Sequence, residues 1–218
     1  MATIADNLQQ IRARLAGTPG VTLLAVSKSQ PMEAVREAVA AGQRAFGENY
    51  VQEAIEKMNA LPKLEWHLIG PLQSNKTRVV AERFDWVQTV ASEKIARRLS
   101  EQRPAGKAPL NVLIQVNVSG EATKSGVTPE EACSLAAIVE GLKGLKLRGL
   151  MAVPEPGADR SRYRSVKKLY DGLKSEYGLD TLSLGMSDDM EVAIAEGSTM
   201  VRIGTAIFGA RRAHRSAA

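Results

Sequence analysis

The chain has 218 residues, 44% of them hydrophobic and 24% charged, a composition typical of one globular domain and unlike a disordered protein or a coiled coil. Of its formal charge of +5, three units come from arginines in the last eight residues, which contain no acid, so the rest of the chain is nearly neutral. This distribution of charge, together with only nine aromatic residues, argues against a nucleic-acid-binding protein.

Cysteine and histidine counts exclude several kinds of site. Cys133 is the only cysteine, so no intrachain disulfide can form and a reducing compartment is expected. With His67 and His214 as the only histidines, the chain cannot supply the four Cys and His ligands of a structural zinc site. The first residues lack a signal-peptide pattern, and no apolar run approaches the ~20 residues that span a bilayer. We therefore expect a cytoplasmic protein with no metal site and no membrane contact.

An amphipathic segment, Ile4–Leu15, opens the chain and predicts a helix. Eight β-type runs follow, at Val21–Lys28, Ala45–Asn49, Glu65–Gly70, Trp86–Val90, Leu110–Val118, Leu147–Val153, Thr181–Met186 and Met200–Phe208. Helical periodicity separates them, as in Pro31–Ala41, Val51–Ala60, Glu93–Gln102, Pro129–Leu142, Arg160–Tyr177 and Asp188–Glu196. Eight alternations of strand and helix are typical of a closed parallel barrel. We predict an α/β fold, a single (β/α)8 TIM barrel over residues 1–210 with an extra N-terminal helix, and a short basic tail at 211–218.

Alternation along the predicted strands places polar side chains on the inner face of the barrel. Lys28, His67 and Arg202 fall opposite the apolar residues that suit the helix-covered face, as do Asn111 and Gln115 of the fifth strand. Polar groups inside a barrel are costly unless they meet a ligand or each other. Because active sites of such barrels lie at the C-terminal ends of the strands, the pattern predicts a polar pocket there.

Lys28 follows the apolar run of the first strand, and two interpretations are open. It can be an ordinary strand-end lysine whose amine reaches water. Alternatively, partial burial lowers the pKa of an amine and frees it to attack a carbonyl carbon, forming a Schiff base. One lysine decides little, so the residues at the other strand ends carry more weight.

Two segments near the last strands can bind a phosphate. Ser187 precedes a predicted helix, which its hydroxyl can cap, although Asp188 with Glu191 already has the pattern of a capping box. The same hydroxyl, with free backbone N–H groups, can bind a phosphate. Gly204 permits close approach of a ligand to the backbone and Thr205 adds a donor. Phosphate sites in barrels recur after strands seven and eight.

Other polar residues have both a structural and a ligand-binding interpretation. Arg202 can pair with a carboxylate or face a pyridine nitrogen, which it would hold unprotonated because a guanidinium only donates. Asn49 can bond a ring substituent, and His67 can pack near a ring, although for His67 we favour a structural role. Lys76 and Lys124 are expected on loops, where they can be solvated or attract a phosphate.

With these residues in place, the chain resembles the pyridoxal-phosphate homeostasis proteins, single-domain relatives of the alanine racemase barrel. The matching stretches, in order along nearly the whole predicted barrel, are Ala25–Lys28, Phe46–Asn49, His67–Lys76, Lys124–Gly126, Gly149–Met151, Leu184–Ser187 and Gly197–Gly209. Departures are small: Leu68 replaces a common phenylalanine, and Ser29 with Gln30 replaces Thr-Lys. Neither departure touches the expected site chemistry.

The resemblance implies a site for pyridoxal 5′-phosphate (PLP). Lys28 would form an aldimine with the cofactor, Arg202 would face its pyridine nitrogen, and a serine, a glycine and a threonine would hold its phosphate. The candidate cofactor-binding residues are Lys28, Asn49, His67, Ser187, Arg202, Gly204 and Thr205. The implied function is to hold and deliver PLP within the cell, with PLP-dependent apo-enzymes as partners and without robust catalysis.

Two enzymatic alternatives compete with this reading. An amino-acid racemase resembles a two-domain dimer, whereas this chain ends soon after the eighth strand, so we expect a monomer. A racemase also needs a second acid–base group, which the sequence does not nominate, and an unprotonated ring nitrogen is a poorer electron sink. A Schiff-base aldolase for sugar phosphates normally carries its lysine on a later strand and needs no arginine on strand eight. The PLP-holding protein is the favoured hypothesis.

Overall fold

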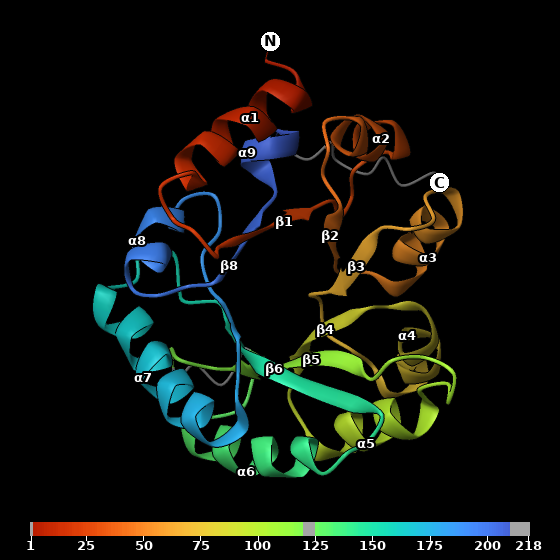
Figure 1. Ribbon diagram of the computed structural model, residues 1–218, viewed down its shortest axis with the longest axis vertical. Helices are drawn as coiled ribbons and strands as arrows, with labels where there is room; N and C mark the ends of the chain where they lie inside the picture. Colours follow the sequence, from red (N-terminus) through yellow and green to blue (C-terminus); the bar gives the residue numbers. More distant parts are fainter. Residues whose placement is uncertain (1, 120–124, 210–218) are drawn as a thin grey trace, which may run out of the picture.

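The computed structural model describes residues 2–119 and 125–209, and its eight strands close into a parallel barrel (Figure 1). Each strand pairs with its neighbours in chain order, and β8 pairs with β1 to complete the circle. The strands are β1 (Thr22–Val26), β2 (Ala45–Glu48), β3 (Glu65–Leu68), β4 (Trp86–Val90), β5 (Leu110–Val116), β6 (Leu145–Ala152), β7 (Thr181–Ser183) and β8 (Met200–Ile203). The predicted (β/α)8 barrel is confirmed, while the predicted tail at 211–218 lies outside the described residues.

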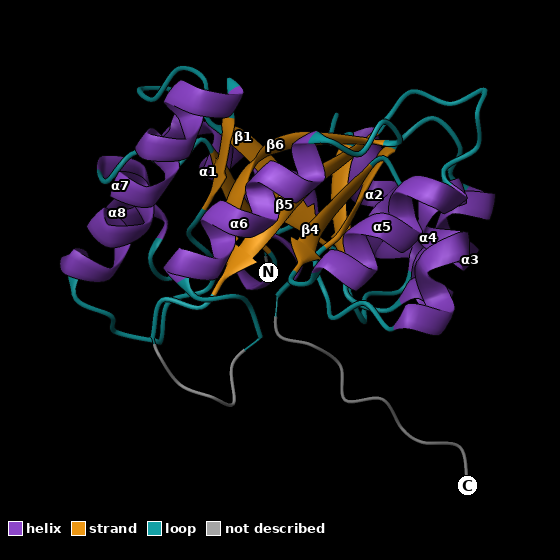
Figure 2. Cartoon of the chain, turned by 90° about the horizontal axis from the view of Figure 1, so that it is seen from below, coloured by secondary structure: helices purple, strands orange, loops and turns teal. Residues whose placement is uncertain are grey.

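Helices form a layer around the outside of the strands (Figure 2). They are α1 (Ile4–Leu15), α2 (Met32–Ala40), α3 (Val51–Ala60), α4 (Thr77–Arg83), α5 (Glu93–Gln102), α6 (Pro129–Glu140), α7 (Arg160–Tyr177), α8 (Met190–Ala195) and α9 (Thr205–Phe208), with a 3₁₀ turn at Ser74–Lys76 before α4. The predicted bounds of α1, α3, α5 and α7 are confirmed, because each has a clear periodic face and an abrupt end in the sequence. No helix in the part of the chain that the structure describes is long and apolar enough to cross a membrane.

Helix ends show where local sequence signals succeed and fail. Thr128 caps α6 through a reciprocal capping box with Glu131, the arrangement favoured by a threonine followed three residues later by a glutamate. In contrast, α2 has Pro31 at its N-cap and no side-chain cap hydrogen bond. The capping box expected of Asp188 with Glu191 is wrong, since α8 begins two residues later and Asp189 is its N-cap. Neither α2 nor α8 therefore has a side-chain hydrogen bond at its N-cap.

The last predicted strand is too long. β8 ends at Ile203, and Thr205–Phe208 forms the short helix α9 rather than strand. Gly204 turns the chain out of the barrel, and its carbonyl accepts from the amides of Ile207 and Phe208. A short apolar run is compatible with either state, which explains the error.

The barrel has two apolar regions and a polar interior. A large core fills the space between strands and helices and includes Val112, Ile114 and Val201, whereas Trp86, Leu113 and Met151 form a small separate cluster. Residues of adjacent strand positions therefore divide between the two sides of the sheet, as alternation predicts. The polar inner side chains His67, Gln88, Ser183 and Arg202 are buried as well.

Helix α1 lies along α9 on the outside of the barrel (Figure 1). The side-chain amide of Asn7 donates to the carbonyl of Ile207 at 2.9 Å, and Arg14 pairs with Glu191. The extra N-terminal helix thus packs on the segment that follows Gly204 and Thr205, and it stabilises that corner of the candidate site.

Candidate functional site

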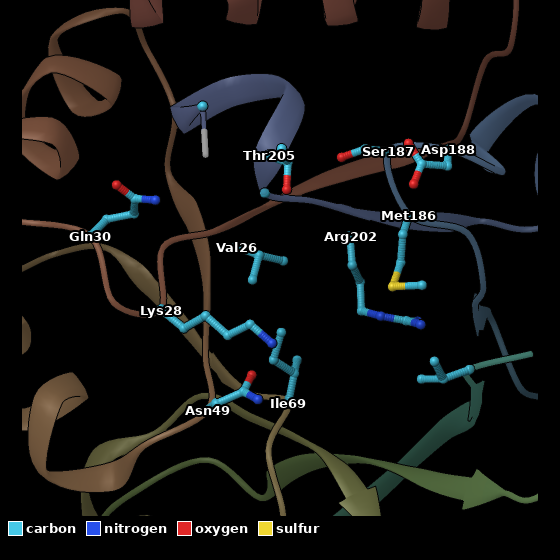
Figure 3. Close-up of a pocket in the computed structure, with 13 residues that line it drawn as sticks. Val26, Lys28, Gln30, Asn49, Ile69, Met186, Ser187, Asp188, Arg202 and Thr205 are labelled. Carbon is cyan, nitrogen blue, oxygen red and sulfur yellow. The ribbon is translucent and has the colours of Figure 1, made fainter. Parts of the chain in front are cut away.

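A cavity of about 380 Å³ opens at the C-terminal ends of the strands (Figure 3). Its lining comes from the last residues of β1 and β8 and from the segments after β1, β2, β3, β6, β7 and β8. The lining residues are Val26, Lys28, Gln30, Asn49, Ile69, Val153, Met186, Ser187, Asp188, Arg202, Gly204, Thr205 and Gly209. Six of the seven predicted site residues meet here, from positions up to 177 residues apart in the sequence.

Lys28 lies two residues beyond β1, and its side chain extends into the cavity toward the side where Arg202 lies (Figure 3). The next residue, Ser29, has φ of 59°, a left-handed conformation unfavourable for a residue with a Cβ atom. Its backbone N–H donates to Oε1 of Glu53 at 2.7 Å. The lysine therefore sits at a sharp turn that a neighbouring helix holds.

A group of three charged side chains, which we call the Lys57 cluster, adjoins this turn. Lys57 and Glu48 are buried, and Glu53 is partly exposed. Nζ of Lys57 donates to Oε1 of Glu48 at 2.7 Å, to Oε1 of Glu53 at 2.7 Å and to the carbonyl of Ser27 at 2.6 Å. Burial raises the pKa of Glu48, and the nearby ammonium opposes that rise. All three ammonium donors are satisfied, so the cluster has one well-defined arrangement.

Arg202 enters the cavity from β8 and is 5% exposed. Its Nη1 donates to the carbonyl and to Oγ of Ser183 at 2.7 and 2.6 Å, and its Nη2 donates to the carbonyl of Ala152 at 2.9 Å. Within residues 2–119 and 125–209, no carboxylate lies close enough to form a salt bridge with it. Burial lowers the pKa of Arg202 to about 10, with Asp189 opposing. A buried cation with only neutral partners favours an anionic ligand.

A chain of hydrogen bonds, which we call the barrel relay, continues from Ser183 through the interior. Oγ of Ser183 donates to Oε1 of Gln88 at 2.7 Å, and Nε2 of Gln88 donates to Nδ1 of His67 at 2.9 Å. Nε2 of His67 then carries the ring proton and donates to Oε1 of Glu65 at 2.8 Å. Every donor points from Arg202 toward Glu65, an alignment in which successive hydrogen bonds polarise one another.

His67 belongs to this relay and does not line the cavity. Its ring is fully buried and stacks on Trp86, with ring centroids 5.0 Å apart. Burial lowers the pKa of His67, and the bond to Glu65 opposes this. Both ring nitrogens are occupied by protein partners, so the structure places His67 in the structural role favoured by its sequence context, apart from the other predicted site residues.

Asn49 follows β2 and borders the cavity near Lys28 (Figure 3). Its Oδ1 is buried and has no hydrogen-bond partner in the described part of the chain. Close packing fixes its backbone, because a Cβ atom on Gly70 would lie 2.3 Å from the Asn49 carbonyl oxygen. An unpartnered buried amide oxygen is a point where a ligand donor would be stabilising.

Ser187 and Thr205 lie on one side of the cavity, on the loops after β7 and β8 (Figure 3). Oγ of Ser187 accepts from the backbone N–H of Ala206 at 3.3 Å, which ties the two loops together. Gly204 packs on β1, where a Cβ atom would approach the Val26 carbonyl to 3.3 Å. The two hydroxyls and the adjacent backbone amides form a compact polar corner suited to a small anion.

The remaining lining explains what shape of ligand fits. Val153 and Met186 are two of the large apolar side chains that remain exposed, at 40% and 39%, and both border the cavity. Apolar walls beside a polar corner and two cations suit a planar ring with an anionic group. No cluster of three or more His, Cys, Asp or Glu side chains that could hold a metal ion occurs among the described residues. Lys76 is exposed outside the cavity, and Lys124 lies outside the described residues.

Sequence reasoning missed the supporting residues rather than the lining. Glu53 and Lys57 have the i, i+4 spacing of an ordinary surface ion pair, and nothing local marks Lys57 as buried. Gln88 and Ser183 join the barrel relay although 95 residues separate them. The only signal in the sequence that could have identified them is their position among the alternate residues of β4 and β7 that face the barrel interior.

Comparison with known proteins agrees with this geometry. The family model of the alanine racemase N-terminal domain matches residues 1–212. A pyridoxal phosphate homeostasis protein of Pseudomonas aeruginosa is 57% identical, with 97% of each chain covered. This chain belongs to the pyridoxal phosphate homeostasis proteins. The resemblance predicted from its motifs is thereby confirmed.

Solved structures of relatives share the fold of the homeostasis proteins. PipY of Synechococcus elongatus, in a structure with PLP bound, is 38% identical and superposes with a TM-score of 0.86, covering 95% of this chain and 100% of PipY. An alanine racemase of Clostridium difficile superposes with a TM-score of 0.80 at 15% identity, and this chain spans 58% of its length. At that identity the racemase shows a common barrel and no more.

Proposed function

We propose that this chain binds PLP in the cavity and holds it covalently on Lys28, and that it thereby contributes to intracellular PLP homeostasis and delivery. The observation that carries the proposal is that Lys28 and Arg202 line one cavity, beside the polar corner of Ser187 and Thr205. Arg202 has no carboxylate partner in the described part of the chain, and its partners are neutral. PipY, a relative with 38% identity, has been solved with PLP bound.

Covalent holding requires a simple condensation. The neutral amine of Lys28 would hold PLP by condensing with its aldehyde, with the carbonyl oxygen and the two amine protons lost as one water. Addition of water would break the same bond and release PLP. Reversibility suits a protein that must release its cofactor, since the free aldehyde is recovered unchanged.

The other lining residues have matching tasks. Ser187, Gly204 and Thr205 would bind the phosphate, which carries a charge of −1.5 to −2 near neutral pH. Burial lowers the pKa of Arg202 to about 10, which leaves the guanidinium charged near neutral pH. Because a charged guanidinium only donates, Arg202 would donate to the pyridine nitrogen and keep that nitrogen unprotonated. Asn49 would bond a ring substituent. The apolar side chains of Val153 and Met186 would contact the ring.

Holding is favoured over catalysis for an electronic reason. An unprotonated pyridine ring withdraws electrons weakly and so assists carbanion formation poorly. We therefore propose that amino acids are not turned over robustly. Relatives at 54% to 57% identity carry the name of homeostasis proteins rather than of enzymes.

Lys28→Ala tests the proposal directly. Wild-type protein with PLP should show an aldimine absorption band, and borohydride should fix the cofactor to the peptide containing Lys28. The variant should lose both signals and keep its fold. Lys76→Ala, a change of an exposed lysine outside the cavity, is the matched control and should behave as wild type. Fixation of PLP to Lys28→Ala at the wild-type extent would refute the assignment.

Further assays distinguish a protein that delivers PLP from an enzyme that uses it. Loaded protein is mixed with a PLP-dependent apo-enzyme, with and without a trap for free aldehyde, and recovery of enzyme activity is followed. Recovery that survives the trap indicates direct transfer, with the apo-enzyme as partner. Saturable conversion of a single L-amino acid to its D-isomer would contradict the proposed role.

A further inference from the structure

The Lys57 cluster joins three segments that surround Lys28. Ser27 directly follows β1, Glu48 ends β2, and Glu53 and Lys57 lie on α3. All of them meet at one ammonium nitrogen, Nζ of Lys57, within 2.7 Å of each acceptor. Helix α3 thus reaches beneath the turn that presents Lys28 to the cavity.

Both neighbours of Lys28 are tied to this cluster. On one side, the Ser27 carbonyl accepts from Lys57, and Oγ of Ser27 donates to Oε1 of Glu48 at 2.6 Å. On the other side, the Ser29 amide donates to Oε1 of Glu53 at 2.7 Å. The same carboxylate oxygen of Glu53 accepts from Lys57, so one rigid unit spans the residues before and after Lys28.

The left-handed backbone of Ser29 gives the hydrogen bond from its amide to Glu53 a specific role, which is to stabilise an unfavourable conformation. Residues with a Cβ atom avoid positive φ unless surrounding contacts hold them there, and Ser29 has φ of 59°. In this conformation the Ser29 amide donates to Glu53. If the turn relaxed, Lys28 would change its direction relative to the cavity.

Stability alone does not account for a buried group of this composition. Lys57 and Glu48 have side chains that are 4% and 0% exposed, and desolvating such charges offsets most of their attraction. A second carboxylate, Glu53, adds like-charge repulsion that raises the pKa of Glu48 further. Well-packed apolar residues would stabilise the fold as well, whereas only polar groups can hydrogen-bond the Ser27 carbonyl and the Ser29 amide.

We propose that Glu53 and Lys57 are positioning residues that hold the turn at Ser29 and so aim Lys28 at its carbonyl partner. The inference rests on the proposed function, because it concerns the reactivity of the same lysine. Glu53 acts through one hydrogen bond to the Ser29 amide, and Lys57 fixes Glu53 and Ser27 in place. Neither side chain lines the cavity.

Three variants on α3 test this. Glu53→Ala removes the acceptor for the Ser29 amide, Glu53→Gln keeps an oxygen there without its charge, and Glu56→Ala is the control because Glu56 is exposed on the same helix. Two quantities are measured: hydrogen exchange of the Ser29 amide in protein without PLP, and the rate at which added PLP becomes borohydride-fixable at Lys28.

We expect wild type and Glu56→Ala to protect the Ser29 amide. Glu53→Ala should lose that protection, and its rate of attachment at Lys28 should fall about 10- to 100-fold, the scale of a misplacement near 1 Å. Glu53→Gln should recover most of both. A merely structural role would lower thermal stability without changing the rate at Lys28.

Two results would overturn the inference. One is a Ser29 amide in folded wild type that exchanges as fast as an unprotected amide, a measurement that needs no variant to fold. The other is a folded Glu53→Ala whose attachment rate equals that of Glu56→Ala. If wild type fails to attach PLP at all, the proposed function fails, while the exchange of the Ser29 amide still decides whether Glu53 holds the turn.

Discussion

Two cations face the same cavity, Lys28 from the β1 side and Arg202 from β8, and the protein surrounds them differently. Next to Lys28, three charged side chains compensate one another within the Lys57 cluster. Next to Arg202, the partners are neutral: a serine and two backbone carbonyls, with Glu65 reached only through the barrel relay.

The difference follows from what each cation must do. A lysine that attacks an aldehyde must be aimed, and charges behind the turn give strong directional hydrogen bonds to the backbone. An arginine that donates to the pyridine nitrogen of a ligand with a net negative charge attracts that ligand best when no protein carboxylate compensates its own charge. Polar neighbours orient the guanidinium while leaving its electrostatic attraction intact. The surroundings of Lys28 therefore orient its side chain, whereas the surroundings of Arg202 leave its positive charge uncompensated.

The largest expected effect is that of Lys57→Met. This change leaves the buried carboxylate of Glu48 and the partly exposed carboxylate of Glu53 without their cation, and we expect a loss of about 3–5 kcal/mol in the free energy of unfolding. Denaturant titration measures it. The deficit should shrink as the pH falls, since protons then neutralise the unpaired carboxylates. A variant as stable as wild type at neutral pH would contradict the account of a compensated cluster.

Arg202→Met should change the stability of the protein little and weaken its binding of PLP strongly, unlike Lys57→Met. Three hydrogen bonds are lost, but a buried cation without a counter-ion is removed as well, so unfolding free energy should change by less than about 1 kcal/mol. Affinity for PLP should weaken about 10- to 150-fold, the loss of one charged hydrogen bond. Equilibrium titration by absorbance gives the affinity. A collapse of stability comparable to that of Lys57→Met would erase the contrast between the two sides.

Gln88→Leu interrupts the barrel relay in its middle. Ser183 Oγ loses its acceptor and Nδ1 of His67 loses its donor, and both stay buried, so we expect a loss of about 1–3 kcal/mol. Chemical denaturation is the measurement, and a Thr89→Val variant, which loses one bond to the Gly70 carbonyl, gives a comparison outside the relay. Unchanged stability of Gln88→Leu would show that the relay is dispensable.

The smallest effect concerns pH. Burial holds the pKa of His67 below its ordinary value of 6.5, so the folded protein keeps the ring neutral while the unfolded chain takes up a proton below pH 6.5. Stability present above pH 6.5 is therefore lost as the pH falls below it, with a slope of up to about 1.4 kcal/mol per pH unit for one proton. His67→Gln should lack this slope between pH 5 and 6.5. Parallel stability profiles of variant and wild type would contradict it.

Local sequence patterns predict much of the structure of this protein. Alternation along the strands places Lys28, Arg202 and His67 on the inner face, and the repeated strand and helix signals give the barrel, whose eight-strand closure the structure confirms. Six of the seven candidate site residues line the cavity because strand ends of a parallel barrel meet at one edge. Boundaries were less accurate, as at α9, where a glycine after β8 redirects an apolar run into a helix.

By itself, then, the sequence determined the barrel and its inward polar residues, because a period of two or 3.6 residues is a local property. The family was recognisable from the resemblance of short motifs, which are local as well. Only the tertiary structure decided which polar groups share hydrogen bonds. Lys57 meets Ser27 across 30 residues, and Ser183 meets Gln88 across 95. Such pairings depend on the register of strands and the docking of α3, which arise when the barrel closes and have no counterpart in any single segment.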